Sequence, residues 1–131
     1  MAKISYVLLL LGEMIVSGNA KGQQVLSPSL DSLLRLGIDL TLRQEYESAM
    51  EVFRNAARGY PDHPAGPLYQ MAVLQAMAMD YEEVVEDGIF DSLLSTATVK
   101  SLAMIEQDQY SPLGYYFLGT AFGHDSYARA Q

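Results

Sequence analysis

The sequence predicts an all-α protein built from antiparallel pairs of helices. Half of its 131 residues are hydrophobic, and they recur at the three- and four-residue spacing that gathers them on one helix face. There are only 5 Pro and 10 Gly, and long stretches lack both residues, which favours helices. Cys is absent, so neither a disulfide framework nor a zinc site with sulfur ligands supports the fold. The length suits one small domain.

The first twenty residues have the order of a secretory signal peptide. Lys3 supplies a positive charge, an apolar stretch of about 13 residues follows, and Gly18 and Ala20 precede a possible cleavage site. A bilayer span needs about 20 apolar residues, so we expect no stable membrane span after cleavage. Residues 1–20 therefore predict export to the periplasm or cell envelope. Glu13 within the apolar stretch favours the alternative, an uncleaved N-terminal helix in a cytoplasmic protein.

The helical domain, expected over residues 21–131, begins with a helix at Ser27-Pro28. Ser27 suits the N-cap because its hydroxyl accepts a first-turn N–H, and Pro28 suits the first helical position because it lacks an N–H. A second helix is expected from near Glu45 to just before Pro61. The apolar and small residues at helical spacing in the two helices are Leu33, Leu36, Gly37, Leu40, Ala49, Phe53, Ala56 and Ala57.

These two helices resemble a tetratricopeptide repeat, a helical hairpin of about 34 residues with fixed large, small and aromatic positions. The residues that match this pattern without a gap are Leu33, Leu36, Gly37, Leu40, Ala49, Phe53, Ala56 and Pro61. Gly37 and Ala49 would let the two helix axes approach closely, and Phe53 would fill the space beside them. The resemblance implies a tetratricopeptide-like α-solenoid, similar to exported bacterial repeat proteins of unassigned role.

A second unit is expected from near Ala65, where Leu68, Met71 and Ala72 repeat the pattern of the first helix. The signature of a third unit starts 47 residues after Leu68 rather than about 34. Its residues are Tyr115, Leu118, Gly119 and Phe122. We therefore expect the second helix of unit two to be lengthened or preceded by an extra turn. Asp87-Gly88 marks the expected break, and an amphipathic helix follows it.

The third unit consists of a single helix from about Pro112, so the chain holds about 2.5 units. A stacked array normally closes with a polar capping helix, and none follows to cover Tyr115, Leu118 and Phe122. We expect either an array that is truncated at its C-terminus or a cap supplied by a neighbouring chain.

The tetratricopeptide resemblance also implies a partner groove, lined by the outward positions of each first helix. Carried over, these positions are Leu34, Ile38, Thr41, Tyr69, Val73, Met77, Tyr116, Thr120 and His124. Chaperone-binding members hold a peptide carboxylate with Lys and Asn there, whereas this sequence has mainly apolar and aromatic residues. An amphipathic helix or hydrophobic peptide fits such a groove better. The alternative is that these side chains pack against the chain's own N-terminal segment or a further C-terminal helix.

The charge distribution excludes nucleic acid as a favoured partner. The net charge is −8, and no Lys or Arg occurs between Gly59 and Val99, so a phosphate backbone would be repelled. The acidic residues in this stretch are Asp62, Asp80, Glu82, Glu83, Glu86, Asp87 and Asp91. The acidic stretch 80–91 lacks the spacing of a calcium loop or a carboxylate di-metal site. We expect a solvated face that attracts a basic partner if it is functional.

No pattern in the sequence supports catalysis, a cofactor or a metal. Phosphate loops and G-x-S-x-G elbows are missing. His124-Asp125-Ser126 has the residue types of a hydrolase triad, but consecutive helical residues point in different directions. His63 is expected to be a solvated or capping side chain in a turn.

The sequence thus predicts a non-catalytic scaffold of the cell envelope or periplasm that binds a protein or peptide through an apolar groove with an acidic flank. The alternative is a structural helical segment of a larger enzyme or secretion assembly that continues past Gln131.

Overall fold

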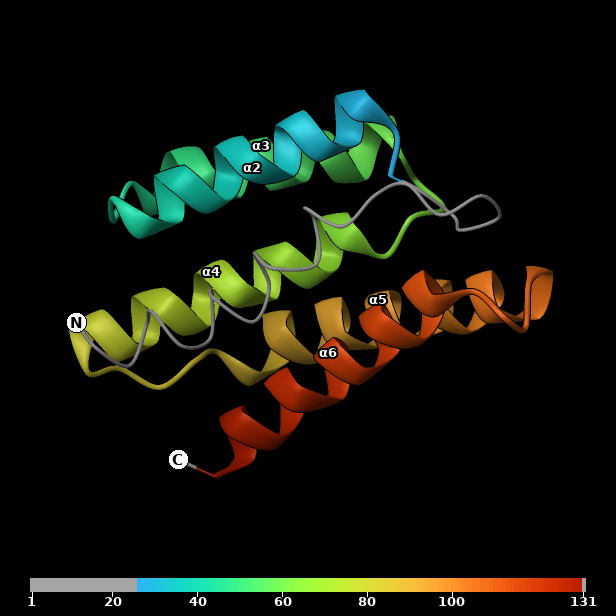
Figure 1. Cartoon of the computed structure of the whole chain (residues 1–131). Helices are drawn as coiled ribbons and strands as arrows, with labels where there is room; N and C mark the ends of the chain where they lie inside the picture. Colours follow the sequence, from blue (N-terminus) through green and yellow to red (C-terminus); the bar gives the residue numbers. More distant parts are fainter. Residues whose placement is uncertain (1–25, 131) are drawn as a thin grey trace.

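The chain forms five helices over residues 26–130, which are the residues that the structure, a computed structural model, describes. They are α2 (Pro28–Leu42), α3 (Tyr46–Gly59), α4 (Ala65–Tyr81), α5 (Asp87–Gln107) and α6 (Pro112–Arg129), with the labels of Figure 1. No strand occurs among the described residues, so the all-α prediction is confirmed. The predicted signal peptide, residues 1–20, lies outside the described part of the chain.

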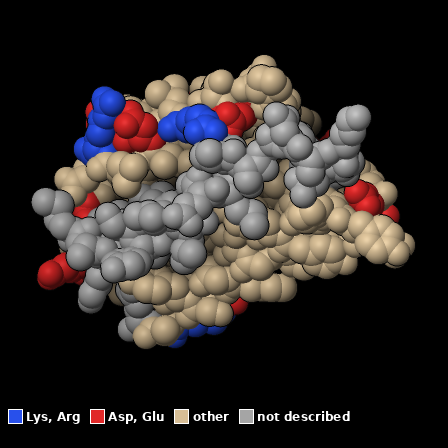
Figure 2. All heavy atoms as spheres, in the orientation of Figure 1, with Lys and Arg blue, Asp and Glu red and all other residues tan. Residues whose placement is uncertain are grey.

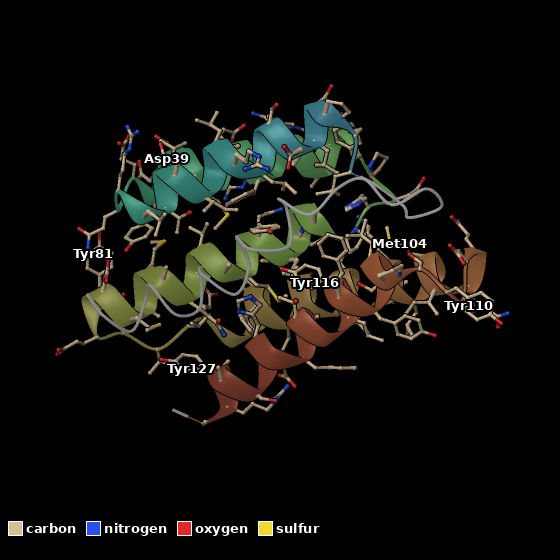
Figure 3. All side chains as sticks on the ribbon, in the orientation of Figure 1. Asp39, Tyr81, Met104, Tyr110, Tyr116 and Tyr127 are labelled. Carbon is tan, nitrogen blue, oxygen red and sulfur yellow. The ribbon has the colours of Figure 1, made fainter. Side chains whose placement is uncertain are left out.

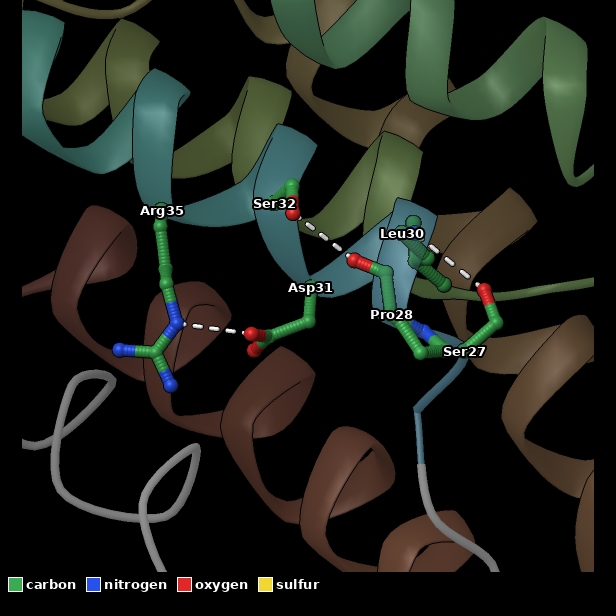
Figure 4. A network of polar contacts seen from close by, with 6 residues as sticks. All are labelled: Ser27, Pro28, Leu30, Asp31, Ser32 and Arg35. Carbon is green, nitrogen blue, oxygen red and sulfur yellow. Dashed lines mark hydrogen bonds and ion pairs between the residues drawn. The ribbon is translucent and has the colours of Figure 1, made fainter.

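Helix α2 begins where the sequence predicts, and Figure 4 shows its polar contacts. Ser27 Oγ accepts the N–H of Leu30 at 3.2 Å, and Pro28 is the first helical residue. Asp31 lies in the first turn, where the helix dipole favours a negative charge. Its carboxylate also accepts a bond from Arg35 Nε at 2.8 Å, and an exposed pair one turn apart contributes about 0.2–0.5 kcal/mol. These local interactions fix the start of the helix.

Two residues with positive φ end helices in this chain. Gln44, with φ 63°, lies in the turn between α2 and α3, and Glu82, with φ 53°, ends α4. The N–H of Glu83 then donates to the carbonyl of Ala78 at 2.9 Å, as expected for a left-handed helix end. Residues 82–86 connect α4 to the 21-residue α5. The extra residues that the sequence predicts for a second unit lie in this connection and in the long α5, which starts at the predicted break, Asp87.

Each helix packs against the next along the chain, and α4 additionally contacts α2 and α6. Figure 1 shows α4 in the middle, between the α2–α3 pair and the α5–α6 pair. The core follows this arrangement and is richest on α4, whose buried apolar residues are Ala65, Leu68, Tyr69, Met71, Ala72, Val73 and Ala76. Helices α3 and α5 make no extensive contact with each other, because α4 lies between them.

Helices α2 and α3 pack closely at Gly37, as predicted. A Cβ added there would lie 2.4 Å from two carbons of the Phe53 ring. Phe53 is 1% exposed and stacks on Tyr69 of α4 at a centroid distance of 5.1 Å and 22°. Ala49 is fully buried on the same side of α3. The ring of Phe53 therefore joins three helices, and Gly37 makes room for it.

The other residues predicted to pack between repeat helices divide into three groups. Ala56, Leu68, Met71 and Ala72 are buried, while Leu33, Leu40 and Leu118 are half-buried. Pro61 and Gly119 are exposed, and Leu36, Tyr115 and Phe122 are 49%, 53% and 53% exposed. The prediction of close packing is corrected at Leu36, which lies on the outer side of α2. Pro61 lies in a turn after α3, and the three exposed residues of α6 lie on the face for which the sequence provides no covering helix.

Candidate functional site

The predicted partner groove is largely closed in this structure. Leu34 and Val73 are fully buried, Thr41 and Tyr69 are 1% exposed, and His124 is 4% exposed. The four remaining positions, which are half-buried, are Ile38, Met77, Tyr116 and Thr120. The expectation of an open groove is therefore corrected at the five buried positions, which belong to the core. The alternative that the N-terminal segment covers this face concerns residues outside the described part of the chain.

The two threonines and His124 on this inner face are hydrogen-bonded within the protein. The hydroxyls of Thr41 and Thr120 donate to carbonyls one turn earlier, at 2.7 and 2.8 Å. Gln75 and His124 form a pair across α4 and α6, in which Gln75 Nε2 donates to the carbonyl of His124 at 2.7 Å. His124 Nδ1 lies 2.5 Å from Gln75 Oε1, and this acceptor places the proton on Nδ1. The pair fastens α6 to α4.

Burial keeps the imidazole of His124 neutral. Its pKa is lowered to about 4 because the surroundings penalise the charged form. The neighbouring Asp125 is paired instead with Arg129 Nε at 2.7 Å, and Ser126 is exposed. His124, Asp125 and Ser126 therefore point in different directions and have different surroundings. No contact between a nucleophile and a base forms among them.

The outer face of α6 carries two exposed aromatic side chains. Tyr115 and Phe122 are each 53% exposed, and Leu118 is half-buried between them. Nothing lies within 4 Å of a Cβ added at Gly119 or Gly123. Figure 2 shows charged side chains over α2, whereas the part of that view over α6 is largely uncharged. Large rings beside small residues make a surface into which another helix can pack.

The acidic connection between α4 and α5 is exposed, as predicted. Glu82, Glu83 and Glu86 are all solvent-exposed, and no group of three or more metal-ligating side chains occurs among the residues described. Within residues 26–130, no helix is both long and apolar enough to cross a bilayer. This region therefore contributes negative charge to the surface.

A cavity of about 690 Å³ opens between the α3–α4 turn and the C-terminal half of α5. Its walls come from Tyr60–His63 of the turn, from α5 and from Leu113 of α6. His63 is held at its edge: the Nδ1 accepts the N–H of Ala65 at 3.1 Å, and the ring meets Phe117 edge-on at 5.1 Å. The predicted capping role of His63 is confirmed, but the cavity beside it was not predicted. Figure 3 shows Met104, another wall residue, beside the α3–α4 connection.

Comparisons with models of protein families, with curated proteins and with solved structures found no similar chain.

Besides the cavity, two features of these surfaces escaped sequence reasoning. The Gln75–His124 pair joins residues 49 positions apart, and a glutamine among apolar helical residues gives no sign of its partner. Gly66 packs directly on Ala57, where an added Cβ would meet the backbone of α3 at 2.7 Å. A Gly next to Pro67 in the sequence was the one available signal of this close approach.

Proposed function

We propose that this chain is a non-catalytic scaffold of the tetratricopeptide type that binds a protein partner by accepting a helix on the outer face of α6. The observation that carries the proposal is the difference between two glycines at matching repeat positions. Gly37 on α2 is covered by the Phe53 ring of α3, whereas nothing lies within 4 Å of the Cβ position at Gly119 on α6. The partner helix would cover Gly119 of α6 in the way that α3 covers Gly37 of α2.

The chemistry of this face favours an amphipathic helix that carries a bulky aromatic residue. Tyr115 and Phe122 lie one turn to either side of Gly119, so the surface is large, small and large in turn. An aromatic side chain of the partner would enter over Gly119. Covering the exposed half of one ring, about 100 Å², contributes about 2–3 kcal/mol before the entropy of association is subtracted. Apolar contact therefore supplies most of the affinity.

The charge of the protein selects among such helices. The net charge is −8, and the exposed connection with Glu82, Glu83 and Glu86 adds a concentrated negative region. A partner with basic residues beside its apolar face would associate faster, and added salt would reduce that advantage. The order of charge, apolar stretch and small residues in residues 1–20 supports a place for this interaction in the periplasm or cell envelope.

A second candidate rests on the same surface. If the natural polypeptide continues past Gln131, the helix that covers α6 belongs to the same chain, and the protein is a structural segment of a larger enzyme or secretion assembly. In that case the face is already occupied in the natural protein. Extending the chain with its natural continuation would bury Phe122 and abolish binding of a helix added in trans.

The experiment uses a defined helix as the probe. A fluorescent helix-stabilised peptide of residues 45–60, the segment that contains the helix covering Gly37, is titrated with the 131-residue chain and followed by anisotropy. We expect binding that weakens about tenfold or more when the peptide carries Phe53→Ala, because an aromatic anchor contributes about 2 kcal/mol.

The matched protein variants are Phe122→Asp and Tyr110→Asp. Tyr110 is also an exposed aromatic residue, at 83%, but it lies in the α5–α6 turn. The Phe122 variant should lose binding, and the Tyr110 variant should keep it. Equal affinity for all forms of the peptide and protein would show that the outer face of α6 is not the site. Dimerisation that Phe122→Asp abolishes would identify the occupant as a second copy of the chain.

A further inference from the structure

The cavity between the α3–α4 turn and α5 is lined by both apolar and polar residues. The apolar residues are Val99, Ala103 and Met104 of α5 and Leu113 of α6. The polar residues, called here the polar edge, are Tyr60, His63, Lys100 and Gln107, with the exposed Asp62. A volume of about 690 Å³ lies within the usual range for small-molecule sites. A lining of both kinds suits a ligand with an apolar body and one polar end.

The polar edge presents hydrogen-bond donors to the cavity. Because His63 Nδ1 accepts the N–H of Ala65 at 3.1 Å, the proton of the neutral imidazole is on Nε2. The ring is steadied by its edge-on contact with Phe117. Burial, and then the nearby charge of Lys100, lower the pKa of His63 to about 4, so it remains a neutral donor at pH 7. The ammonium group of Lys100 adds further donors and a positive charge.

Lys100 is unusual among the cations of residues 26–130. Each arginine there forms an ion pair with a carboxylate, at Arg35, Arg43, Arg54, Arg58 and Arg129. Lys100 is half-buried and forms no ion pair with a described residue, although acids outnumber bases by 16 to 8 in the chain. An ammonium group on the wall of an apolar cavity attracts an anion from solution.

We propose that this cavity binds a small organic acid with an apolar body, whose carboxylate is held by Lys100 and His63 and whose body lies along Val99, Ala103 and Met104. A charged acceptor bonded to an ammonium group and a neutral N–H makes charge-assisted hydrogen bonds. Lys100 supplies one positive charge to the cavity, and the exposed Asp62 supplies one negative charge. A second negative charge on the ligand would have no cation to pair with, so we expect monocarboxylates to be preferred. It is independent of the outer face of α6, because Tyr115, Gly119 and Phe122 do not line it.

The test uses decanoate below its micellar concentration, with decanamide as the uncharged analogue of the same shape. Binding to the 131-residue chain is measured by calorimetry, and the methyl signal of Met104 in protein labelled at its methionine methyl groups reports the location. We expect decanoate to bind about tenfold or more tightly than decanamide and to shift the Met104 signal, because a hydrogen bond to a charged group is worth about 1.5–3 kcal/mol.

Two variants test whether the carboxylate of decanoate binds beside Lys100 in the cavity. Lys100→Gln should weaken decanoate about ten- to hundredfold and leave decanamide unchanged. Val99→Glu places a carboxylate in the cavity at a residue that is 62% exposed, so it should repel decanoate while preserving the fold. Arg54→Gln, which removes an exposed cation outside the cavity, is the control and should change neither affinity.

The ligand's carboxylate could belong either to a free organic acid or to the C-terminus of a protein chain. A peptide with an apolar C-terminal residue and a free carboxylate distinguishes these two sources. If it displaces decanoate and depends on Lys100, the natural ligand is the end of a protein chain, and if it does not, the ligand is a free acid. Equal binding of decanoate and decanamide, or unchanged decanoate binding in Lys100→Gln and Val99→Glu, would overturn the assignment. Neither result would alter the expected effect of Phe122→Asp on helix binding.

Discussion

Replacing Gly37 with Ala is expected to destabilise the protein, although Ala is the better helix former. The new Cβ would lie 2.4 Å from Phe53 Cε1 and Cζ and 2.9 Å from Cε2, so the ring has to move. It has little room, because Phe53 is 1% exposed and stacks on Tyr69 at 5.1 Å. Overpacking of this kind lowers the free energy of unfolding by about 1–3 kcal/mol. The higher helix propensity of Ala raises it by about 0.5–1 kcal/mol. The expected net loss is about 0–2.5 kcal/mol, centred near 1 kcal/mol.

Gly119→Ala is the matched control at the same repeat position. An added Cβ there meets no atom within 4 Å, so only the helix propensity changes. We expect a gain of about 0.5–1 kcal/mol. The two substitutions are chemically identical, and their opposite signs would isolate the contact with Phe53 from every general effect of exchanging Gly for Ala.

Urea unfolding followed by circular dichroism measures both free energies. Thermal unfolding is a second measurement, in which a change of 1 kcal/mol in the free energy of unfolding shifts the midpoint temperature of a domain of this size by about 4–8 °C. Gly37→Ala should regain most of its loss when it is combined with Phe53→Leu, because the smaller side chain vacates the space. If Gly37→Ala stabilised the chain as much as Gly119→Ala, the close packing of α2 and α3 would be refuted.

Two further predictions concern backbone strain and acid stability. Gln44→Gly should raise the free energy of unfolding by about 0.5–1 kcal/mol, because Gln44 adopts a φ of 63° that Gly occupies without strain. Urea unfolding would check this, and no gain would argue against the turn geometry. Stability should fall as the pH drops from about 6.5 toward 4, because the unfolded state protonates His63 and His124 first, while their folded pKa values are about 4. His124→Asn should flatten part of this dependence in unfolding experiments between pH 4 and 7, and an unchanged slope would contradict the burial of His124.

The helix boundaries could be predicted from the sequence because the signals that set them are local. Ser27 with Pro28, and Ser111 with Pro112, both become N-caps followed by a first-turn proline. The contact between Gly37 and Phe53 was also predictable, because the repeat pattern relates residues a fixed distance apart. Pattern and spacing thus determine which helices form and which consecutive helices meet.

The proposed binding surfaces could not be predicted in the same way, because burial depends on contacts that are distant in sequence. Leu34 and Val73 belong to helical faces that a repeat pattern assigns to an open groove, yet both are fully buried. The cavity beside Lys100 lies between the α3–α4 turn and α5, and α3 and α5 make no extensive contact with each other. The sequence departs from the predicted repeat spacing in this region, so the repeat pattern carries no information about this space.

The two end helices of the described chain differ in what surrounds their exposed apolar residues. In stacks of helices, a terminal helix stays soluble alone when its outer face is polar. Helix α2 exposes Leu36 and Leu42, but it also carries the ion pairs of Asp31 with Arg35 and of Asp39 with Arg43, at 2.8 and 2.7 Å. Helix α6 exposes Tyr115 and Phe122 and has no charged side chain before Asp125. Its exposed rings therefore lie on a stretch of helix without charge, and burial against another helix would remove them from water.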